Sequence, residues 1–173
     1  MLAGTADHGR AEDPDMRGND AAKVRFFPPG IPLLAILAGV GLDRLVPLGL
    51  PFLPDPPARY ALGGAIVAGA IAALGAWPVL LFRAGGQSAN PWKPTPRLEE
   101  RGPYRVTRNP MYLQMVLVCV GVAVALANGW ILLLTPLVAL ALQRLAIEPE
   151  EAYLEARFGE AYRDYRRRVR RWI

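Results

Sequence analysis

The chain has 173 residues, of which 53% are hydrophobic and 20% are charged, and its formal net charge is +5. A single cysteine and a single histidine, His8 in a polar leader, exclude an internal disulfide, a cysteine-rich zinc site and a histidine-based triad or metal cluster. Long stretches carry no charge, which argues against a soluble nucleic-acid-binding protein. Any chemistry must therefore use carboxylates, Arg, Tyr, Asn and a bound cofactor.

Residues 1–25 are rich in Asp, Gly, Arg and Asn and have no apolar centre, so they do not match a secretory signal peptide. We expect this range to form a disordered cytoplasmic leader. The remaining residues, 26–173, are long enough for one domain of ordinary size.

Four apolar stretches follow, at about 31–46, 61–82, 111–127 and 130–145. The second has 22 residues without a charge, enough for about 33 Å of helix. The Asn128-Gly129 pair between the last two predicts a tight turn, and hence a helical hairpin. We predict an all-α integral membrane protein with about four transmembrane helices, a C-terminal helical hairpin and a cytoplasmic helical tail. A hairpin inside a soluble bundle is the alternative, but all four stretches would then need burial on every face.

Cations are distributed unevenly around these stretches. Of the 20 Lys and Arg residues, 18 lie in the leader, in the loop at 83–110, or in the part of the chain from Arg144 onward. Because cytoplasmic segments of membrane proteins carry the excess of Lys and Arg, we expect both termini and that loop in the cytoplasm. The expected location is the cell (inner) membrane. High usage of Ala, Leu, Arg and Pro is typical of a GC-rich bacterial genome.

The loop at 83–110 contains several prolines, which prevent a helix and favour an extended, turning path. Pro110 lies where the third stretch begins, a favoured place for proline, and Asn109 before it is suited to cap that helix. Arg108 beside a helix N-terminus predicts a site for a carboxylate or phosphate. The alternative is a rigid basic loop whose arginines only meet lipid head groups.

The tail at 146–173 begins with an acidic segment. Pro149 predicts a helix start, and Gly159 predicts its end. A basic helix is expected from Glu160 to Arg171. The glutamates Glu150 and Glu151 lie close to the end of the fourth stretch, and hence near the bilayer surface. The alternative gives them a role in helix-dipole stabilisation alone, with the basic helix lying on the membrane surface.

Taken together, three groups of residues in this half of the chain resemble a known family. They are Gly102–Arg105, Arg108–Tyr112, and the spaced series Glu150, Glu151, Leu154, Phe158, Gly159, Tyr162 and Tyr165. Their order and spacing are similar to the integral membrane methyltransferases, a group that includes isoprenylcysteine carboxyl methyltransferase and phospholipid N-methyltransferase. The resemblance covers about residue 90 to residue 173. The isoprenylcysteine enzymes usually have Arg-His-Pro where this chain has Arg108-Asn109-Pro110.

The resemblance implies methyl transfer from S-adenosylmethionine to a lipophilic acceptor at the cytoplasmic membrane face. The acceptor would be an isoprenylcysteine-like carboxylate, a phospholipid amine or another apolar small molecule. Arg108 suits the cofactor carboxylate, and Glu150 or Glu151 suits its ammonium or ribose. Aromatic faces and hydroxyls of tyrosines suit the adenosyl group or the sulfonium. The implied cofactor-binding residues are Tyr104, Arg108, Asn109, Pro110, Tyr112, Glu150 and Glu151.

Arg108 and Glu150 are also the candidates for a catalytic role, and no metal is implied. Two other functions stay open. A membrane reductase of the sterol-reductase type has a similar C-terminal topology and uses NADPH. A non-catalytic membrane scaffold would keep the fold without the chemistry. Binding of S-adenosylmethionine rather than NADPH separates the first two.

Overall fold

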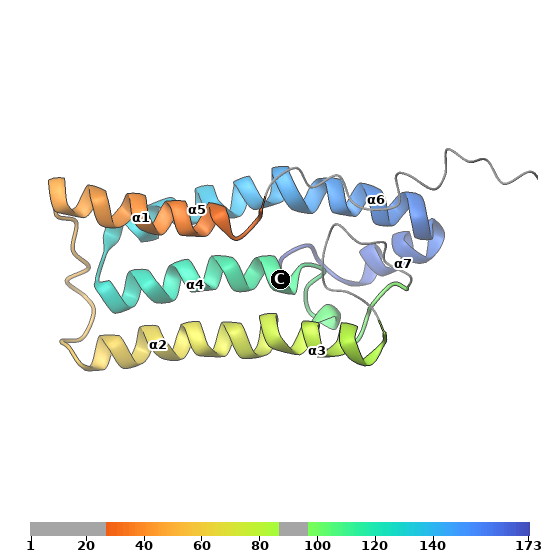
Figure 1. Cartoon of the computed structure of the whole chain (residues 1–173), viewed down its shortest axis with the longest axis horizontal. Helices are drawn as coiled ribbons and strands as arrows, with labels where there is room; N and C mark the ends of the chain where they lie inside the picture. Colours follow the sequence, from red (N-terminus) through yellow and green to blue (C-terminus); the bar gives the residue numbers. More distant parts are fainter. Residues whose placement is uncertain (1–26, 87–96) are drawn as a thin grey trace, which may run out of the picture.

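The computed structural model describes residues 27–86 and 97–173 (Figure 1). The predicted leader and residues 87–96 of the predicted cytoplasmic loop lie outside this range. The helices within it are α1 (Gly30–Leu45), α2 (Ala58–Ala70), α3 (Trp77–Ala84), α4 (Pro110–Leu126), α5 (Gly129–Leu142), α6 (Glu148–Phe158) and α7 (Glu160–Arg168). A 3₁₀ turn (Gly102–Arg105) and two π-helical turns (Ile71–Ala76 and Gln143–Ile147) complete the helical elements. The described residues contain no strand, so the all-α prediction is confirmed.

The predicted second stretch forms one continuous helix of 27 residues, Ala58–Ala84, which joins α2 to α3. It extends three residues before and two residues after the predicted range. The π turn at Ile71–Ala76 directly precedes Pro78 in the first turn of α3. Since proline lacks an N–H and clashes with the preceding turn of a regular helix, the wider π turn lets the helix continue through it.

A second long helix joins α5 to α6 over the 30 residues Gly129–Phe158. Pro149 lies in the first turn of α6, as predicted, but α6 is not a separate helix, because the π turn at Gln143–Ile147 joins it to α5 without a break. The helix therefore extends from the apolar bundle into the polar end of the molecule.

These two long helices are the ones in the described ranges that are long and apolar enough to cross a membrane. The apolar helix α4 is shorter, with 17 residues, and α1 has 16. That the protein has four transmembrane helices remains a prediction.

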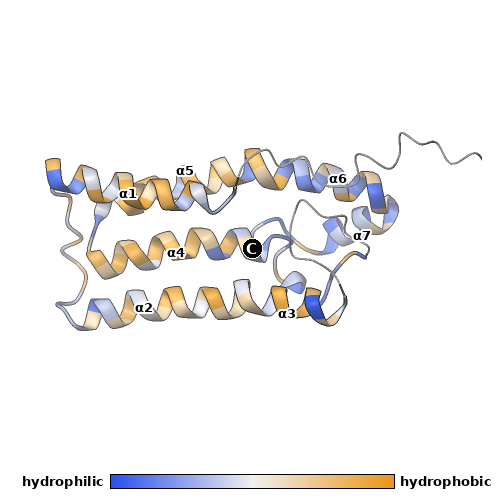
Figure 2. Cartoon of the chain, viewed as in Figure 1, coloured by the Kyte–Doolittle hydropathy of each residue, from blue (hydrophilic) through white to orange (hydrophobic). Residues whose placement is uncertain are grey.

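The helices lie side by side, with α4 packed against α2, α5 and α1 (Figure 1). The core between them contains Tyr112, Cys119, Ile131, Val138 and Leu142. The outer faces are also apolar, as Figure 2 shows along the whole bundle. Large exposed side chains there include Leu33, Leu34, Leu37, Leu80, Leu133, Leu137 and Leu140. Apolar surface of this extent is typical of contact with lipid.

The predicted turn between α4 and α5 is present, and it begins one residue earlier, at Ala127. Ala127 adopts the left-handed conformation, with φ 49°. Asn128 caps α5, since its Oδ1 accepts a hydrogen bond from the backbone N–H of Ile131 at 2.9 Å. Its Nδ2 donates to the carbonyl of Gly39 in α1 at 3.3 Å, so the same side chain also holds α1.

Close packing of α2 on α4 depends on Gly63. A Cβ added there would lie 2.4 Å from the carbonyl oxygen of Gly121 and 2.6 Å from the backbone nitrogen of Ala125, whereas a Cβ at Gly64 would meet nothing within 4 Å. We expect Gly63→Ala to reduce the free energy of unfolding by about 2 kcal/mol, because the two helix backbones must separate. The measurement is thermal unfolding in detergent.

Gly64→Ala is the matched control, and it should leave the melting temperature unchanged or raise it slightly, since alanine favours helix. Equal melting temperatures for the two variants would contradict the close α2–α4 contact.

Candidate functional site

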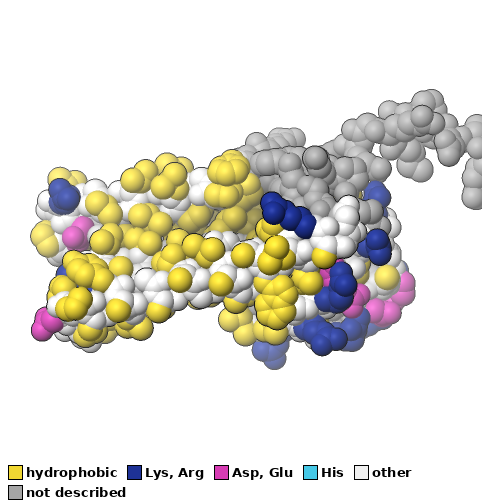
Figure 3. All heavy atoms as spheres, turned by 60° about the horizontal axis from the view of Figure 1, so that its bottom comes forward, with side chains coloured by type: hydrophobic (Ala, Val, Ile, Leu, Met, Phe, Trp, Pro, Cys, Tyr) yellow, Lys and Arg dark blue, Asp and Glu magenta, His cyan; other side chains and the backbone are white. Residues whose placement is uncertain are grey.

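Charged side chains gather at one end of the bundle, around α6, α7 and the segment before α4. Figure 3 shows Lys, Arg, Asp and Glu clustered there and a few more charged side chains at the opposite end, with hydrophobic side chains spread over the surface between the two ends. All the sequence-predicted site residues lie in this end of the molecule or at its border with the core.

The segment before α4 is fixed by Tyr104, which lies in the 3₁₀ turn and is buried. Its ring packs edge-on against Phe82 of α3, with centroids 5.7 Å apart. The hydroxyl of Tyr165 in α7 donates to the carbonyl of Tyr104 at 2.8 Å. Burial raises the pKa of Tyr165, which keeps its hydroxyl protonated as a donor. Tyr104 therefore ties α3 and α7 to the site.

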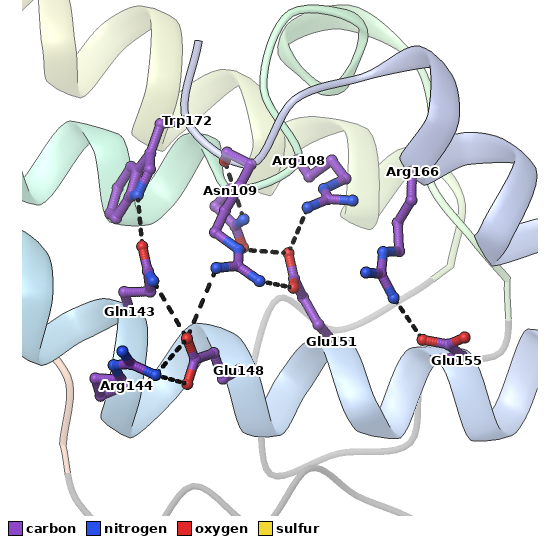
Figure 4. Close-up of polar contacts among 10 residues, drawn as sticks. Arg108, Asn109, Gln143, Arg144, Glu148, Glu151, Glu155, Arg166 and Trp172 are labelled. Carbon is purple, nitrogen blue, oxygen red and sulfur yellow. Dashed lines mark hydrogen bonds and ion pairs between the residues drawn. The ribbon is translucent and has the colours of Figure 1, made fainter.

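Arg108 and Glu151 form a direct ion pair. Nη2 of Arg108 lies 2.9 Å from Oε1 of Glu151, and the two side chains are 9% and 8% exposed (Figure 4). Arg171 binds the same carboxylate with two nitrogens, Nη2 at 2.6 Å from Oε2 and Nε at 3.2 Å from Oε1. Nε of Arg108 is buried and has no hydrogen-bond partner among the described residues. One carboxylate is thus shared by two guanidinium groups, and one buried donor is left unpaired.

Glu150 faces a different neighbour. The hydroxyl of Tyr112 in α4 donates to its Oε2 at 3.0 Å. Burial raises the pKa of Glu150, the hydrogen bond from Tyr112 lowers it, and the negative charge of Glu151 raises it, with a net shift upward. Adjacent glutamates on α6 therefore have separate surroundings.

The prediction that the side chain of Asn109 caps α4 is wrong. Pro110 does begin α4, but Nδ2 of Asn109 donates to the carbonyl of Arg171 at 3.1 Å and no side-chain cap is formed. Thr107 holds the residue before α4 instead, since its Oγ1 accepts a hydrogen bond from the backbone N–H of Asn109 at 3.1 Å. The side chain of Asn109 does not cap α4 because a tertiary contact, with the carbonyl of Arg171, occupies it.

The predicted basic helix Glu160–Arg171 is shorter than expected. The helix α7 ends at Arg168, and Val169 is in extended conformation. The chain then turns back, and the indole N–H of Trp172 donates to Oε1 of Gln143 at 3.1 Å (Figure 4). The apolar side of α7 explains the turn, since Tyr162, Tyr165 and Val169 form a buried cluster against α6.

The structure therefore brings together Arg108, Tyr112, Glu150 and Glu151, with Asn109 and Pro110 beside them, while Tyr104 is linked to the group through Tyr165. Sequence reasoning missed Thr107, Arg171 and Trp172. Nothing local marks them, because Arg171 lies in a run of arginines that is typical of a solvated tail. The described residues contain no group of three or more side chains suited to a metal ion.

The profile of the phospholipid methyltransferase family matches residues 58–161, more than half of the chain. The chain belongs to this family. It is therefore an S-adenosylmethionine-dependent methyltransferase and a membrane protein. This membership argues against the two alternative functions, a membrane reductase and a non-catalytic scaffold. The matched range contains every predicted site residue and ends before Arg171.

An uncharacterized protein of Haemophilus influenzae is 36% identical to this chain over 63 residues, which cover 36% of the chain and all of that protein. No solved structure matches the chain.

The residues at the site fit the amino-acid part of the family's cofactor, which carries a carboxylate and an ammonium. Arg108, Arg171 and Glu151 together carry one net positive charge, which is compatible with a carboxylate, and Nε of Arg108 has no hydrogen-bond partner among the described residues. Glu150, the neighbour of Glu151 on α6, adds a second carboxyl group, which is compatible with an ammonium.

Removing the negative charge of Glu151 should destabilise the protein even without a ligand. In Glu151→Gln the guanidinium groups of Arg108 and Arg171 would face each other without compensation, so we expect a loss of about 3 kcal/mol in the free energy of unfolding. Thermal unfolding of the ligand-free protein in detergent measures this.

Glu155→Gln is the matched control on the same helix. Its carboxylate pairs with Arg163 and Arg166 at the surface, where an ion pair contributes at most about 1 kcal/mol. If Glu151→Gln melts at the temperature of this control, the buried pair does not stabilise the fold.

Proposed function

We propose that this protein transfers a methyl group from S-adenosylmethionine to a lipophilic acceptor at the cytoplasmic face of a membrane, with Arg108 and Glu150 as the principal cofactor-binding residues. The observation that carries the proposal is the buried Arg108, whose Nε has no hydrogen-bond partner in the described structure, beside a separately held carboxylate at Glu150. Family membership supplies the reaction class.

The opposite charges of Arg108 and Glu150 support the binding of a zwitterion. Arg108 donates to a carboxylate, and Glu150 accepts from an ammonium or a ribose hydroxyl. Both oxygens of Glu151 are already bound by arginines, so Glu151 orients Arg108 and does not itself bind the ammonium. Tyr112 orients Glu150 through its hydroxyl. Asn109 and Pro110 directly follow Arg108 in the chain, and both are buried, as is Tyr104.

Methyl transfer requires little acid–base chemistry from these residues. The cofactor supplies an electrophilic methyl group, so the protein contributes alignment of the acceptor and exclusion of water. The site lies at the end of an apolar bundle whose outer faces suit lipid, and an acceptor dissolved in the bilayer reaches it along that surface. The acceptor is a lipid or another apolar molecule with a carboxylate, an amine or a thiol to methylate.

The proposed topology has four spans, formed by α1, α2 with α3, α4, and α5. The site end carries the loop and tail arginines, whereas Arg44 and Arg59 lie at the opposite end of α1 and at the start of α2. The excess of cations at the site end supports a cytoplasmic location for it. At about 1.5 Å per residue, α1 and α4 are shorter than a typical hydrocarbon core of about 30 Å, which local thinning of the bilayer can accommodate.

Cofactor binding tests the function. The full chain, purified in detergent, should bind S-adenosylhomocysteine with micromolar affinity, about −8 kcal/mol in calorimetry. Glu150→Gln and Arg108→Met should each weaken binding by about 2 kcal/mol, since each loses a charge-assisted hydrogen bond.

Arg105→Met is the control for Arg108→Met, because Arg105 is exposed, and it should bind like the parent. Folded parent protein that does not bind S-adenosylhomocysteine would overturn the assignment of the site.

Cysteine labelling of intact cells tests the topology, in a Cys119→Ala background. A cysteine introduced at the exposed Asp55 should react at once with an impermeant reagent, and one at the exposed Ala161 only after the cells are opened. The reason is that residues 47–57 lie at the end of the bundle opposite to α7. Immediate labelling at Ala161 would place the site on the outer face and contradict the proposal.

A further inference from the structure

The segment Val169–Ile173 crosses the candidate site. After α7 ends, the backbone N–H of Val169 donates to the carbonyl of Tyr165 at 3.0 Å, and the buried Val169 side chain anchors the turn. The following residues lie beside the start of α4, where the chain end is marked in Figure 1. This segment therefore reaches the same place as Arg108 by a separate path.

The backbone of this segment receives three hydrogen bonds from the residues before α4. The N–H of Arg108 donates to the carbonyl of Arg170 at 3.0 Å. Oγ1 of Thr107 and Nδ2 of Asn109 both donate to the carbonyl of Arg171 at 3.1 Å. Two consecutive carbonyls thus hold three consecutive residues, including the arginine that is proposed to bind the cofactor.

The side chains of the same segment reach the opposite wall of the site. The guanidinium of Arg171 spans both oxygens of Glu151, and its Nη1 lies 3.7 Å from Glu148. The indole of Trp172 binds Gln143 within the π turn. The segment therefore joins the residues before α4 to the long α5–α6 helix by both main chain and side chains.

We propose that Arg171 is a positioning residue of the cofactor site, which keeps Arg108 available for a ligand by occupying Glu151. A carboxylate that faces a single arginine tends to form a bidentate pair with it, through two parallel hydrogen bonds. Such a pair with Glu151 would occupy the donors of Arg108 that are proposed to bind the ligand. With Arg171 bound to both oxygens, Glu151 touches Arg108 through one nitrogen, and Nε of Arg108 keeps its unpaired hydrogen. This inference rests on the proposed function of Arg108.

The test compares charge-matched variants of the full chain in detergent, with S-adenosylhomocysteine as the probe in calorimetry. Arg171→Met should bind about tenfold more weakly than the parent. Arg171→Lys should recover part of this loss, because it keeps the charge but not the planar fork. Arg167→Met removes the same charge from an exposed position on α7 and should bind within twofold of the parent.

A second variant tests the backbone contact without changing charge. Thr107→Val keeps the side-chain shape but loses the hydroxyl that bonds to the carbonyl of Arg171 and to the N–H of Asn109, so we expect about threefold weaker binding. This variant decides the question if Arg171→Met fails to fold.

Three results would overturn the inference: Arg171→Met binding like the parent, Arg171→Lys binding no better than Arg171→Met, or Thr107→Val binding like the parent. Failure of the proposed function is distinguishable, since the parent itself would then not bind S-adenosylhomocysteine.

Discussion

The buried carboxylate of Glu151, shared between Arg108 and Arg171, is the constraint on which the site depends. It joins three segments that are distant in sequence: α6, the residues before α4, and the segment after α7. Charges removed from water are stable only when every partner stays in place, so this one ion cluster fixes how the segments lie relative to one another. In the same cluster, Nε of Arg108 has no hydrogen-bond partner among the described residues.

The cluster can form only because the α5–α6 helix continues past Pro149. The π turn at Gln143–Ile147 carries the helix from the apolar bundle into the charged end, so Glu150 and Glu151 are presented by a rigid element. The same turn provides Gln143 as an anchor for Trp172. A membrane methyltransferase needs such a border, because its cofactor is charged and soluble whereas its acceptor is lipophilic.

Adjacent residues on one helix have different roles here because successive side chains point in directions about 100° apart. Glu151 points toward two arginines, and Glu150 points toward Tyr112. The charge of Glu151 therefore holds the two arginines in place, whereas the charge of Glu150 is the one suited to a ligand. Asn109 illustrates the same effect: its side chain is used by the carbonyl of Arg171 and not by the helix that it precedes.

The sequence by itself determined the helical class, the apolar stretches to within a few residues, Pro110 as a helix start, Gly159 as a helix end, and the family. These features depend on local composition, on residues with restricted backbone conformations and on the spacing of Arg108, Glu150 and Glu151. Only the tertiary structure decided the continuity through Pro149, the left-handed Ala127, and the contacts of Thr107, Arg171 and Trp172. The contacts of Thr107, Arg171 and Trp172 join segments up to 64 positions apart, and a run of arginines has the same composition whether it is solvated or folded back into a site.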